Sequence, residues 1–280
     1  MRLLRGRTRR VLFPASVAFL ALFGTIALGL GAVRIRPKEV VEALWAGISS
    51  LLTGSEAAGG VVYTIVVGLR LPRVFLSALT GASLALSGAV YQGIFRNPMA
   101  DPYVMGASAG ASLGAACAFM LPLRLRAFSL GTAPVLAFAG SLAAVALVYN
   151  LARIGERTPI LNLILSGVIV SAVLSSAVSL LMFLSSNQDL HGLVYWLMGG
   201  FSGKQWDYVI ATLPYFAAGA LTVFYHSREL NAMLLGDDEA QHLGINVQRV
   251  TRNLVVAASL LTASAAASGG VIGFVGLVVP

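Results

Sequence analysis

One short stretch of the sequence carries a pattern that could do catalysis. Residues 106–110 read GASAG, a match to the G-x-S-x-G elbow that exposes a nucleophilic serine, here Ser108, in α/β-hydrolases. That elbow needs a buried strand before it, and an acid and a histidine after it. The residues before it are turn formers instead: Asn97, Pro98, Asp101 and Pro102. No strand-like run precedes any of the three histidines, which are His191, His226 and His242.

The same small residues recur at every third or fourth position and describe a flat helix face. Such a face lets a second helix approach closely inside a bilayer. We therefore interpret Ser108 as a packing residue near one end of a membrane helix. An intramembrane hydrolase that uses Ser108 is kept as an alternative.

Composition indicates the class of protein. Of the 280 residues 58% are hydrophobic and 11% charged, and the mean hydropathy is +0.85. These values lie outside the range of soluble globular domains and predict a polytopic, all-α membrane protein. The single cysteine, Cys117, lies in an apolar run and reads as a small core residue.

Apolar runs long enough to cross a bilayer as helices recur along the chain. We place spans near 11–33, 74–95, 103–121, 132–152, 160–185, 207–225 and 250–268, with another apolar run from Val271 to Pro280. The net charge of +8 is concentrated before the first span, where five arginines lie within the first ten residues. This pattern predicts a cytoplasmic N-terminus rather than a nucleic-acid partner.

With that orientation the loops alternate between the two sides of the membrane. The cytoplasmic loops are 96–102, 153–159 and 226–249, and the outer ones are 34–73, 122–131 and 186–206. The interiors of the spans carry no Asp, Glu, Lys or His, which an ion-coupled secondary carrier would need. Such a carrier is the alternative from another class. The sequence also shows no Walker sequence, so we expect a separate subunit to supply the energy.

Two segments of the chain echo each other. Residues 79–90 (LTGASLALSGAV) reappear, with one residue dropped, as 261–271 (LTASAAASGGV). In the predicted topology the two copies cross the membrane in opposite directions, as in inverted-repeat transporters. If so, the second repeat has barely begun at residue 280, and we expect the chain to be truncated at its C-terminus.

Several runs, in this order, resemble the permease subunits of ABC importers for iron(III)-siderophores, haem and cobalamin. They are 69–73 (LRLPR), 81–88, 92–102 (QGIFRNPMADP), 106–110, 196–203 (WLMGGFSG), 234–244 (LLGDDEAQHLG) and 273–280 (GFVGLVVP). The resemblance implies a ten-helix fold of inverted repeats, of which about seven to eight helices are present. It also implies a homodimer in the bacterial cytoplasmic (inner) membrane, cytoplasmic ABC ATPase subunits and an extracytoplasmic substrate-binding protein. Residues 1–280 would form one permease domain.

The resemblance also assigns roles to individual residues. Each of these residues has a simpler structural explanation as well, which is given with it. Arg70 and Arg73 would dock the binding protein, or else snorkel at a helix end. Asn97, Met99 and Thr158 would constrict the cytoplasmic gate, although Asn-Pro also starts turns. The loop 226–249 would hold two coupling helices, or be a plain hairpin.

For that loop we expect one short helix over 229–235, closed by Gly236, and a second one opened by a capping box of Asp238 with Gln241 and closed by Gly244. The ATPase-coupling residues would be Leu235, Gly236, Asp237, Asp238, Glu239 and Gly244. No catalytic residue, metal ligand or cofactor is expected. The expected cargo is an iron-siderophore chelate, with haem or cobalamin as the alternatives.

Overall fold

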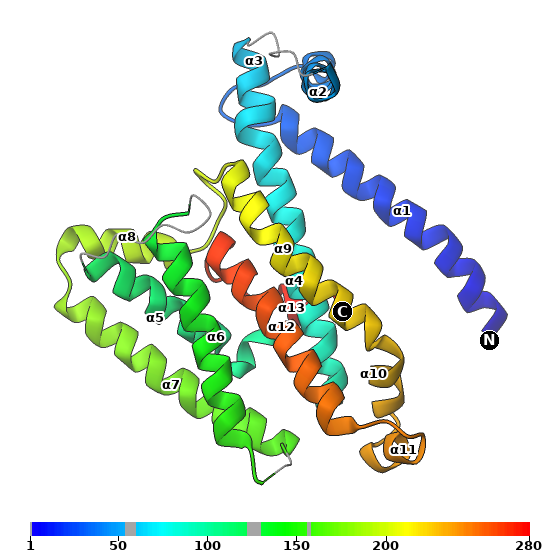
Figure 1. The fold of residues 1–280 in the computed structure, drawn as a ribbon. Coiled ribbons are helices and arrows are strands. Elements are labelled where there is room, and N and C mark those ends of the chain that lie inside the picture. Colours follow the sequence, from blue (N-terminus) through cyan, green and yellow to red (C-terminus); the bar gives the residue numbers. More distant parts are fainter. Residues whose placement is uncertain (1, 54–59, 122–129, 156–157) are drawn as a thin grey trace. The chain divides into compact units, whose positions relative to one another are not determined.

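The computed structural model describes residues 2–53, 60–121, 130–155 and 158–280, with side chains from Pro14 onward except that of Leu51. These residues are almost entirely helical (Figure 1). The chain divides into two compact units, Met1–Phe75 with Gly203–Trp206, and Leu76–Ser202 with Asp207–Pro280. The predicted loops 122–131 and 153–159 lie partly outside the described residues.

The first unit is built around the beginning of one long helix. It contains α1 (Arg2–Gly29), α2 (Pro37–Thr53), α3 (Val61–Tyr63), the π-helix η1 (Thr64–Arg70) and the first turn of α4 (Leu71–Phe95). Its small core is formed by the buried side chains of Leu28, Ile35, Val40, Ala43 and Val66. α2 packs closely on η1, because a Cβ on Gly47 would lie 3.5 Å from Val67.

Two predictions about this region are wrong. The span expected at 74–95 begins instead at Val61, because α3, η1 and α4 form one continuous helix of 35 residues. The segment expected as the loop 34–73 contains the 17-residue helix α2. Pro72 suggested a helix end, but it follows the wide π-helical turn at the second position of α4, where its ring and missing N–H are tolerated.

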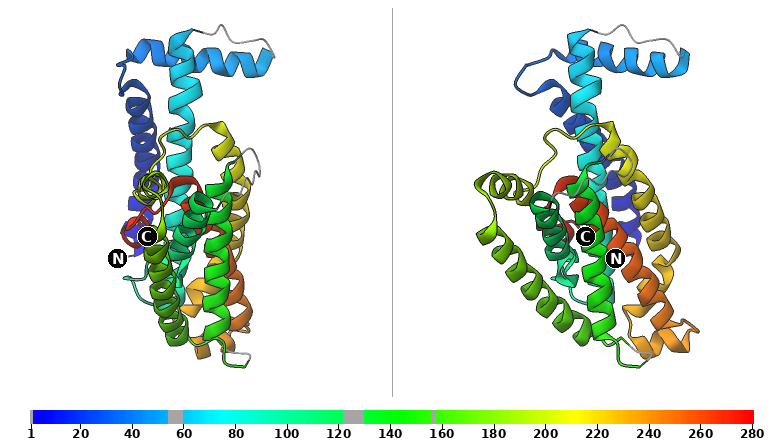
Figure 2. Two further views of the ribbon diagram at one scale, coloured as in Figure 1. Left: turned by 90° about the vertical axis from the view of Figure 1, so that its left-hand side faces the viewer. Right: turned by 60° about the vertical axis from the view of Figure 1, so that its left-hand side comes forward.

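The second unit holds the remaining helices (Figure 2). After α4 come the 3-10 helix η2 (Pro102–Met105), α5 (Ala107–Met120), α6 (Thr132–Ala152), α7 (Ile160–Leu184), α8 (Asn187–Leu197), α9 (Trp206–Tyr225), α10 (Ser227–Met233), α11 (Asp237–His242), α12 (Val247–Gly269) and α13 (Val275–Val278). Within the described residues, the helices long and apolar enough to cross a membrane are Val61–Phe95, α6, α7, α9 and α12.

The predicted span 103–121 is shorter than expected. Asp101 accepts a hydrogen bond from the Tyr103 amide (2.7 Å) and opens η2, and Gly106 then adopts φ 79° and separates η2 from α5. α5 is left with 14 residues, or roughly 21 Å of helix, less than the hydrocarbon thickness.

The small residues of α5 serve close packing against α6. A Cβ on Gly110 would lie 2.3 Å from the carbonyl oxygen of Gly140, and one on Gly114 would lie 2.0 Å from that of Leu136. Ser108 is the second residue of α5, is half-buried, and accepts a hydrogen bond from Ser112 at its backbone carbonyl. A 3-10 helix rather than a strand precedes it, so this segment is not a hydrolase elbow.

The two echoing segments lie antiparallel and in contact. Thr80 is hydrogen-bonded to Ser268 (3.4 Å), and Ser87 to Thr262 (2.6 Å), all four side chains being buried. Thr80 corresponds to Thr262 in the echo, and Ser87 to Ser268. Each contact therefore repeats the other with the copies exchanged, which is what a local two-fold axis requires. The inverted echo is thus a structural relation between α4 and α12.

Burial and hydropathy run in opposite directions among the apolar helices of this unit. α7 is the most apolar and the least buried, whereas α12 is the least apolar and the most buried. The buried face of α12 consists largely of Ala, Ser and Thr. Its hydroxyls bond to its own carbonyls, as Ser259 does to Val255 (2.6 Å), which satisfies them inside the bundle.

Candidate functional site

The hairpin formed by α10 and α11, residues 227–242, is the best-defined polar feature of the second unit. His226 precedes α10 and is buried; its Nε2 accepts a hydrogen bond from Asn253 Nδ2 on α12 (3.2 Å), and its Nδ1 lies 3.8 Å from the Glu229 carboxylate. Met233 of α10 and Ala240 of α11 are buried in the hydrophobic core of the unit. The hairpin is therefore packed on the bundle rather than a free loop.

Two glycines set the shape of the hairpin. Gly236 has φ 139°, and its amide donates to the carbonyl of Met233 (3.2 Å). Gly244 has φ 80° and donates to the carbonyl of Gln241 (2.8 Å). Both conformations favour glycine. The predicted role of Gly244 in closing the second short helix is confirmed, because it directly follows the C-cap Leu243. Gly236 does not close the first helix, whose C-cap is Leu234, but begins the second one as its N-cap.

The predicted helix bounds and capping box need correction. The first short helix is Ser227–Met233 rather than 229–235, because the chain already turns at Leu234 and Leu235. The second helix begins at Asp237, with Gly236 as its N-cap and no side-chain cap. Asp238 lies inside the first turn, where the helix dipole stabilises its negative charge. It does not cap the helix with Gln241.

An ion pair joins the hairpin to the end of α4. Arg96 follows the last residue of α4 and has φ 49°, and its guanidinium donates to the Asp237 carboxylate. The pair is partly exposed, so it fixes geometry more than it adds stability. Arg96 could not be recognised from the sequence as part of this pair, because its acceptor Asp237 lies 141 residues further along the chain.

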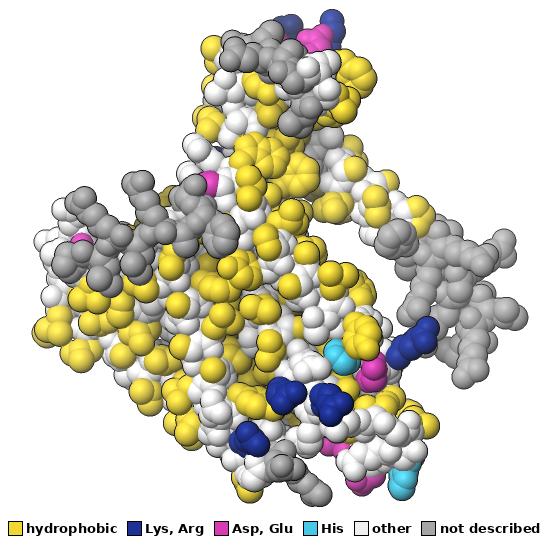
Figure 3. Space-filling view, in the orientation of Figure 1, with side chains coloured by type: hydrophobic (Ala, Val, Ile, Leu, Met, Phe, Trp, Pro, Cys, Tyr) yellow, Lys and Arg dark blue, Asp and Glu magenta, His cyan; other side chains and the backbone are white. Residues whose placement is uncertain are grey.

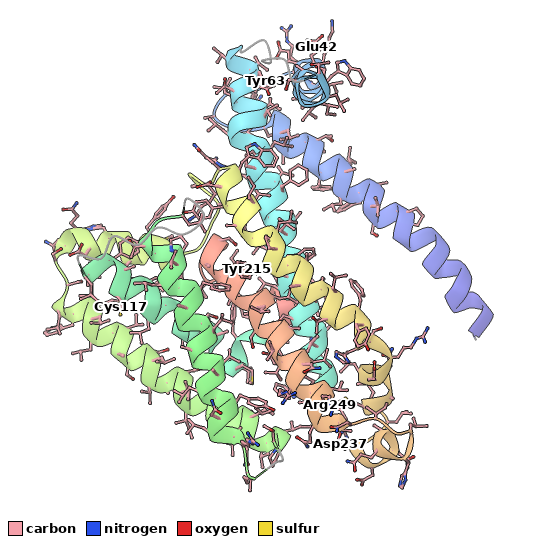
Figure 4. The ribbon with its side chains drawn as sticks, viewed as in Figure 1. Glu42, Tyr63, Cys117, Tyr215, Asp237 and Arg249 are labelled. Carbon is pink, nitrogen blue, oxygen red and sulfur yellow. The ribbon has the colours of Figure 1, made fainter. Side chains whose placement is uncertain are left out.

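The outer surface of the hairpin combines acidic and apolar side chains. Asp238 and Glu239 are exposed, and so are the leucines beside them: Leu234, Leu235 and Leu243. On the face in Figure 3, charged side chains gather over α10, α11 and the start of α12, below a largely apolar surface. Asp237 and Arg249 lie at this end (Figure 4).

The residues expected at the cytoplasmic gate are placed in two different settings. Asn97 and Met99 share one turn, in which the Asn97 side chain accepts a hydrogen bond from the Met99 amide (2.9 Å) and Met99 is exposed. Thr158 is buried, and its amide donates to Gln248 Oε1 on α12 (3.2 Å). The link from Thr158 to α12 was not foreseen, because nothing in the local sequence marks Gln248.

The two arginines expected to dock a binding protein differ from each other. Arg70 donates to the carbonyls of Leu28 (2.6 Å) and Val33 at the end of α1. Gly31 leaves room for this, since a Cβ there would lie 2.7 Å from Arg70 Nη2. Arg73 is exposed. Arg70 is thus engaged within its own unit, and Arg73 presents its side chain outward.

The comparisons with known proteins agree with this arrangement. Residues 19–280 match the FecCD transport family. The chain belongs to that family. It is 40% identical over 265 residues to the ABC transporter permease YvrB of Bacillus subtilis, described as uncharacterized, covering 94% of this chain and 74% of that protein. The FecCD assignment makes the chain an ABC importer permease, a multi-pass protein of the inner membrane.

Two further FecCD comparisons bear on function. The cobalamin import permease BtuC of Halobacterium salinarum is 45% identical over 217 residues, which cover 77% of this chain and 58% of that protein. A solved structure assigned to the metal-chelate type of ABC transporter, in an inward-facing conformation, matches with a TM-score of 0.80 and 27% identity. The match covers 96% of this chain and 79% of the chain in the solved structure. The family model confirms the family expected from the motifs, and the solved structure confirms the helical permease fold.

Proposed function

We propose that this chain is the membrane subunit of an ATP-driven importer that moves an iron-siderophore chelate into the cytoplasm. Its partners would be cytoplasmic ABC ATPase subunits, an extracytoplasmic binding protein and a second copy of the chain. Residues 1–280 would belong to one permease domain, with a cytoplasmic N-terminus and a coupling loop at 226–249. Relatives are named for cobalamin, hemin, Fe(3+)-citrate and molybdate, so haem and cobalamin remain the alternative cargoes.

The α10–α11 hairpin is the observation that carries the proposal. It is fixed to α12 through His226 and to the end of α4 through Arg96. A partner that pushes on the hairpin would therefore move two membrane helices together, because a rigid element transmits a displacement that a mobile loop would absorb. The exposed leucines and the acidic side chains of Asp238 and Glu239 offer that partner both apolar and charged contacts.

The remaining candidate residues take their roles from this arrangement. Arg73 would pair with acidic side chains of the binding protein, since a guanidinium makes bidentate contacts with carboxylates. Arg70 would support this contact indirectly, because its hydrogen bonds hold the end of α1 in place. Asn97, Met99 and Thr158 would narrow the cytoplasmic end of the pathway.

The test of energy coupling is Gly236→Val in a permease that spans the full length of relatives such as YvrB, reconstituted into vesicles with its ATPase and binding protein. A β-branched residue cannot adopt φ 139° without strain of about 1–3 kcal/mol, so the hairpin must rearrange. We expect ATP hydrolysis to persist while uptake per ATP falls. Gly203→Val is the matched control, because Gly203 also has positive φ (72°) and open space around it but lies outside the hairpin.

Unchanged uptake per ATP in Gly236→Val would contradict the coupling role. Uptake that a proton or sodium gradient drives without ATP would instead support a secondary carrier. The cargo is tested separately, by measuring which chelates the partner binding protein delivers: a ferric siderophore, ferric citrate, haemin or cobalamin. Uptake of haemin or cobalamin without uptake of any ferric siderophore would overturn the cargo assignment and leave the coupling result intact.

A further inference from the structure

Helix α2 presents two separate apolar faces, only one of which is buried. Val40, Ala43 and Gly47 are buried on the face toward η1. A second stripe, made of Val41, Trp45, Ile48 and Leu52, has exposed fractions of 64%, 71%, 51% and 82%. The spacing of i, i+4, i+7 and i+11 puts these four side chains on one side of the helix.

The elements next to α2 indicate what surrounds this stripe. α2 ends at Thr53, eight residues before the apolar helix Val61–Phe95, which is long enough to cross a membrane. It packs against Tyr63 and Val67 of that helix. At the same level, the carbonyl of Val67 accepts a hydrogen bond from Nε1 of Trp206 (3.0 Å), the first residue of the apolar helix α9. α2 is therefore packed on the first turns of one apolar helix, beside the first residue of another, and this position favours the interface between hydrocarbon and headgroups.

A cleft between α1 and α2 adjoins the exposed stripe and shares Val41 with it. It measures about 600 Å³ and is lined mainly by apolar side chains, among them Leu22 and Ile26 of α1 and Val41 and Leu44 of α2. Arg34 also lines it. An apolar cleft with one guanidinium suits an acyl chain whose phosphate group meets the arginine.

The charges around the cleft are consistent with an anionic ligand. Arg34 and Arg36 are exposed, directly before α2. Two carboxylates lie nearby: Glu39 accepts a hydrogen bond from the Arg36 amide (3.0 Å), and Glu42 lies 3.7 Å from the Lys38 ammonium. Three cations against these two carboxylates leave residues 34–42 with a net charge of +1. The two arginine side chains are thus presented at the start of the helix.

We propose that α2 is an interfacial helix and that it forms, with α1, a binding site for an anionic phospholipid of the surrounding membrane. The side chains of Val41, Trp45, Ile48 and Leu52 insert among the acyl chains, and one acyl chain occupies the α1–α2 cleft. Arg34 and Arg36 bind the lipid phosphate. This site belongs to the first unit, and it does not depend on which cargo the importer carries or on the coupling hairpin.

The first test measures what surrounds each face of α2. In the full chain with Cys117→Ala, a nitroxide is attached to a single cysteine at position 41, 45 or 48, or, as matched controls on the polar face, at 42 or 49. The protein is reconstituted alone into phosphatidylcholine vesicles containing phosphatidylglycerol. We expect positions 41, 45 and 48 to be accessible to oxygen and shielded from an aqueous nickel chelate, at a depth of about 5–10 Å. Positions 42 and 49 should show the reverse.

Two outcomes of this test would overturn the proposal. Access of the nickel chelate to position 45 would show that the stripe faces water. Shielding of position 45 from both oxygen and nickel would show that protein covers it, either a second copy or another part of this chain.

The second test addresses the headgroup. A bimane on Val41→Cys reports on the cleft through quenching by phosphatidylglycerol or phosphatidylcholine that carries a nitroxide on its acyl chain. We expect phosphatidylglycerol to be preferred, and Arg34→Gln to reduce that preference roughly fivefold, the effect of one cation near an anionic surface. The same bimane on Ser49→Cys should show no preference. Equal quenching by the two lipids in the unaltered cleft would overturn the assignment of an anionic phospholipid.

Discussion

The close approach of α5 and α6 leads to a quantitative prediction for Gly114→Ala. The added Cβ would lie 2.0 Å from the Leu136 carbonyl oxygen and 2.9 Å from the Ala137 amide nitrogen. Both are backbone atoms, so no side-chain rotation relieves the contact. Carbon–oxygen contacts between helices lie near 3.3 Å, so the helices must part by about 1.3 Å along this line.

That displacement sets the expected loss of stability. Overpacking a close-packed interface by one methyl group typically costs about 1–3 kcal/mol. At about 2 kcal/mol, the folding equilibrium shifts roughly thirtyfold toward the unfolded state. Cys117 and Leu113, which line the groove beside this contact together with Gly114, should become more accessible as the helices part.

The assay is reversible unfolding in mixed detergent micelles, with Gly81→Ala as the matched control. Gly81 lies in the middle of α4, and a Cβ there meets nothing within 4 Å. Its replacement by alanine should be neutral or stabilise by up to about 1 kcal/mol, since alanine is the better helix former. Equal stability of Gly114→Ala and Gly81→Ala would contradict the close approach of α5 and α6, because the methyl group added at Gly114 would then have no energetic consequence.

Two further predictions concern buried contacts. The hydroxyl pair Ser87–Thr262 (2.6 Å) should give a coupling energy of about 0.6 kcal/mol in a double-mutant cycle of the alanine variants, and additive effects would contradict a direct bond. Arg70→Gln should speed amide hydrogen exchange at residues 28–33, because two carbonyl bonds are lost, whereas Arg73→Gln should not; equal rates in both variants would contradict the role given to Arg70.

The class of fold and most membrane spans could be predicted because they depend on composition along the chain. An apolar run of about 20 residues has few alternatives to a membrane helix, whatever its neighbours are. The role of the GASAG stretch followed from the same physics, since small residues at helical spacing pack closely in a bilayer. The echo around Thr80 and Thr262 could be read as inverted only because the topology had been assigned first.

What could not be predicted depends on contacts between distant segments. α2 was missed because its apolar residues are divided between two faces, so that no continuous apolar run marks it. Arg70 looked free for docking because its acceptors are backbone carbonyls, which leave no trace in side-chain patterns. In the hairpin, Gly236 was recognised by its position between two helical patterns, but the cap assigned to Asp238 failed because the glycine itself occupies the N-cap.

The opposite order of burial and hydropathy in α7 and α12 has a consequence for how the protein is made. A nascent helix partitions into the bilayer according to its own side chains, before its partners have gathered around it. α7 carries enough Leu, Ile and Val to enter alone, whereas α12, rich in Ala, Ser and Thr, gains much less from lipid. α12 would therefore enter late and with assistance, resting on α4 and α6 already in the membrane. Stable insertion of α12, the most buried of these helices, would thus depend on partner helices that are already in the membrane.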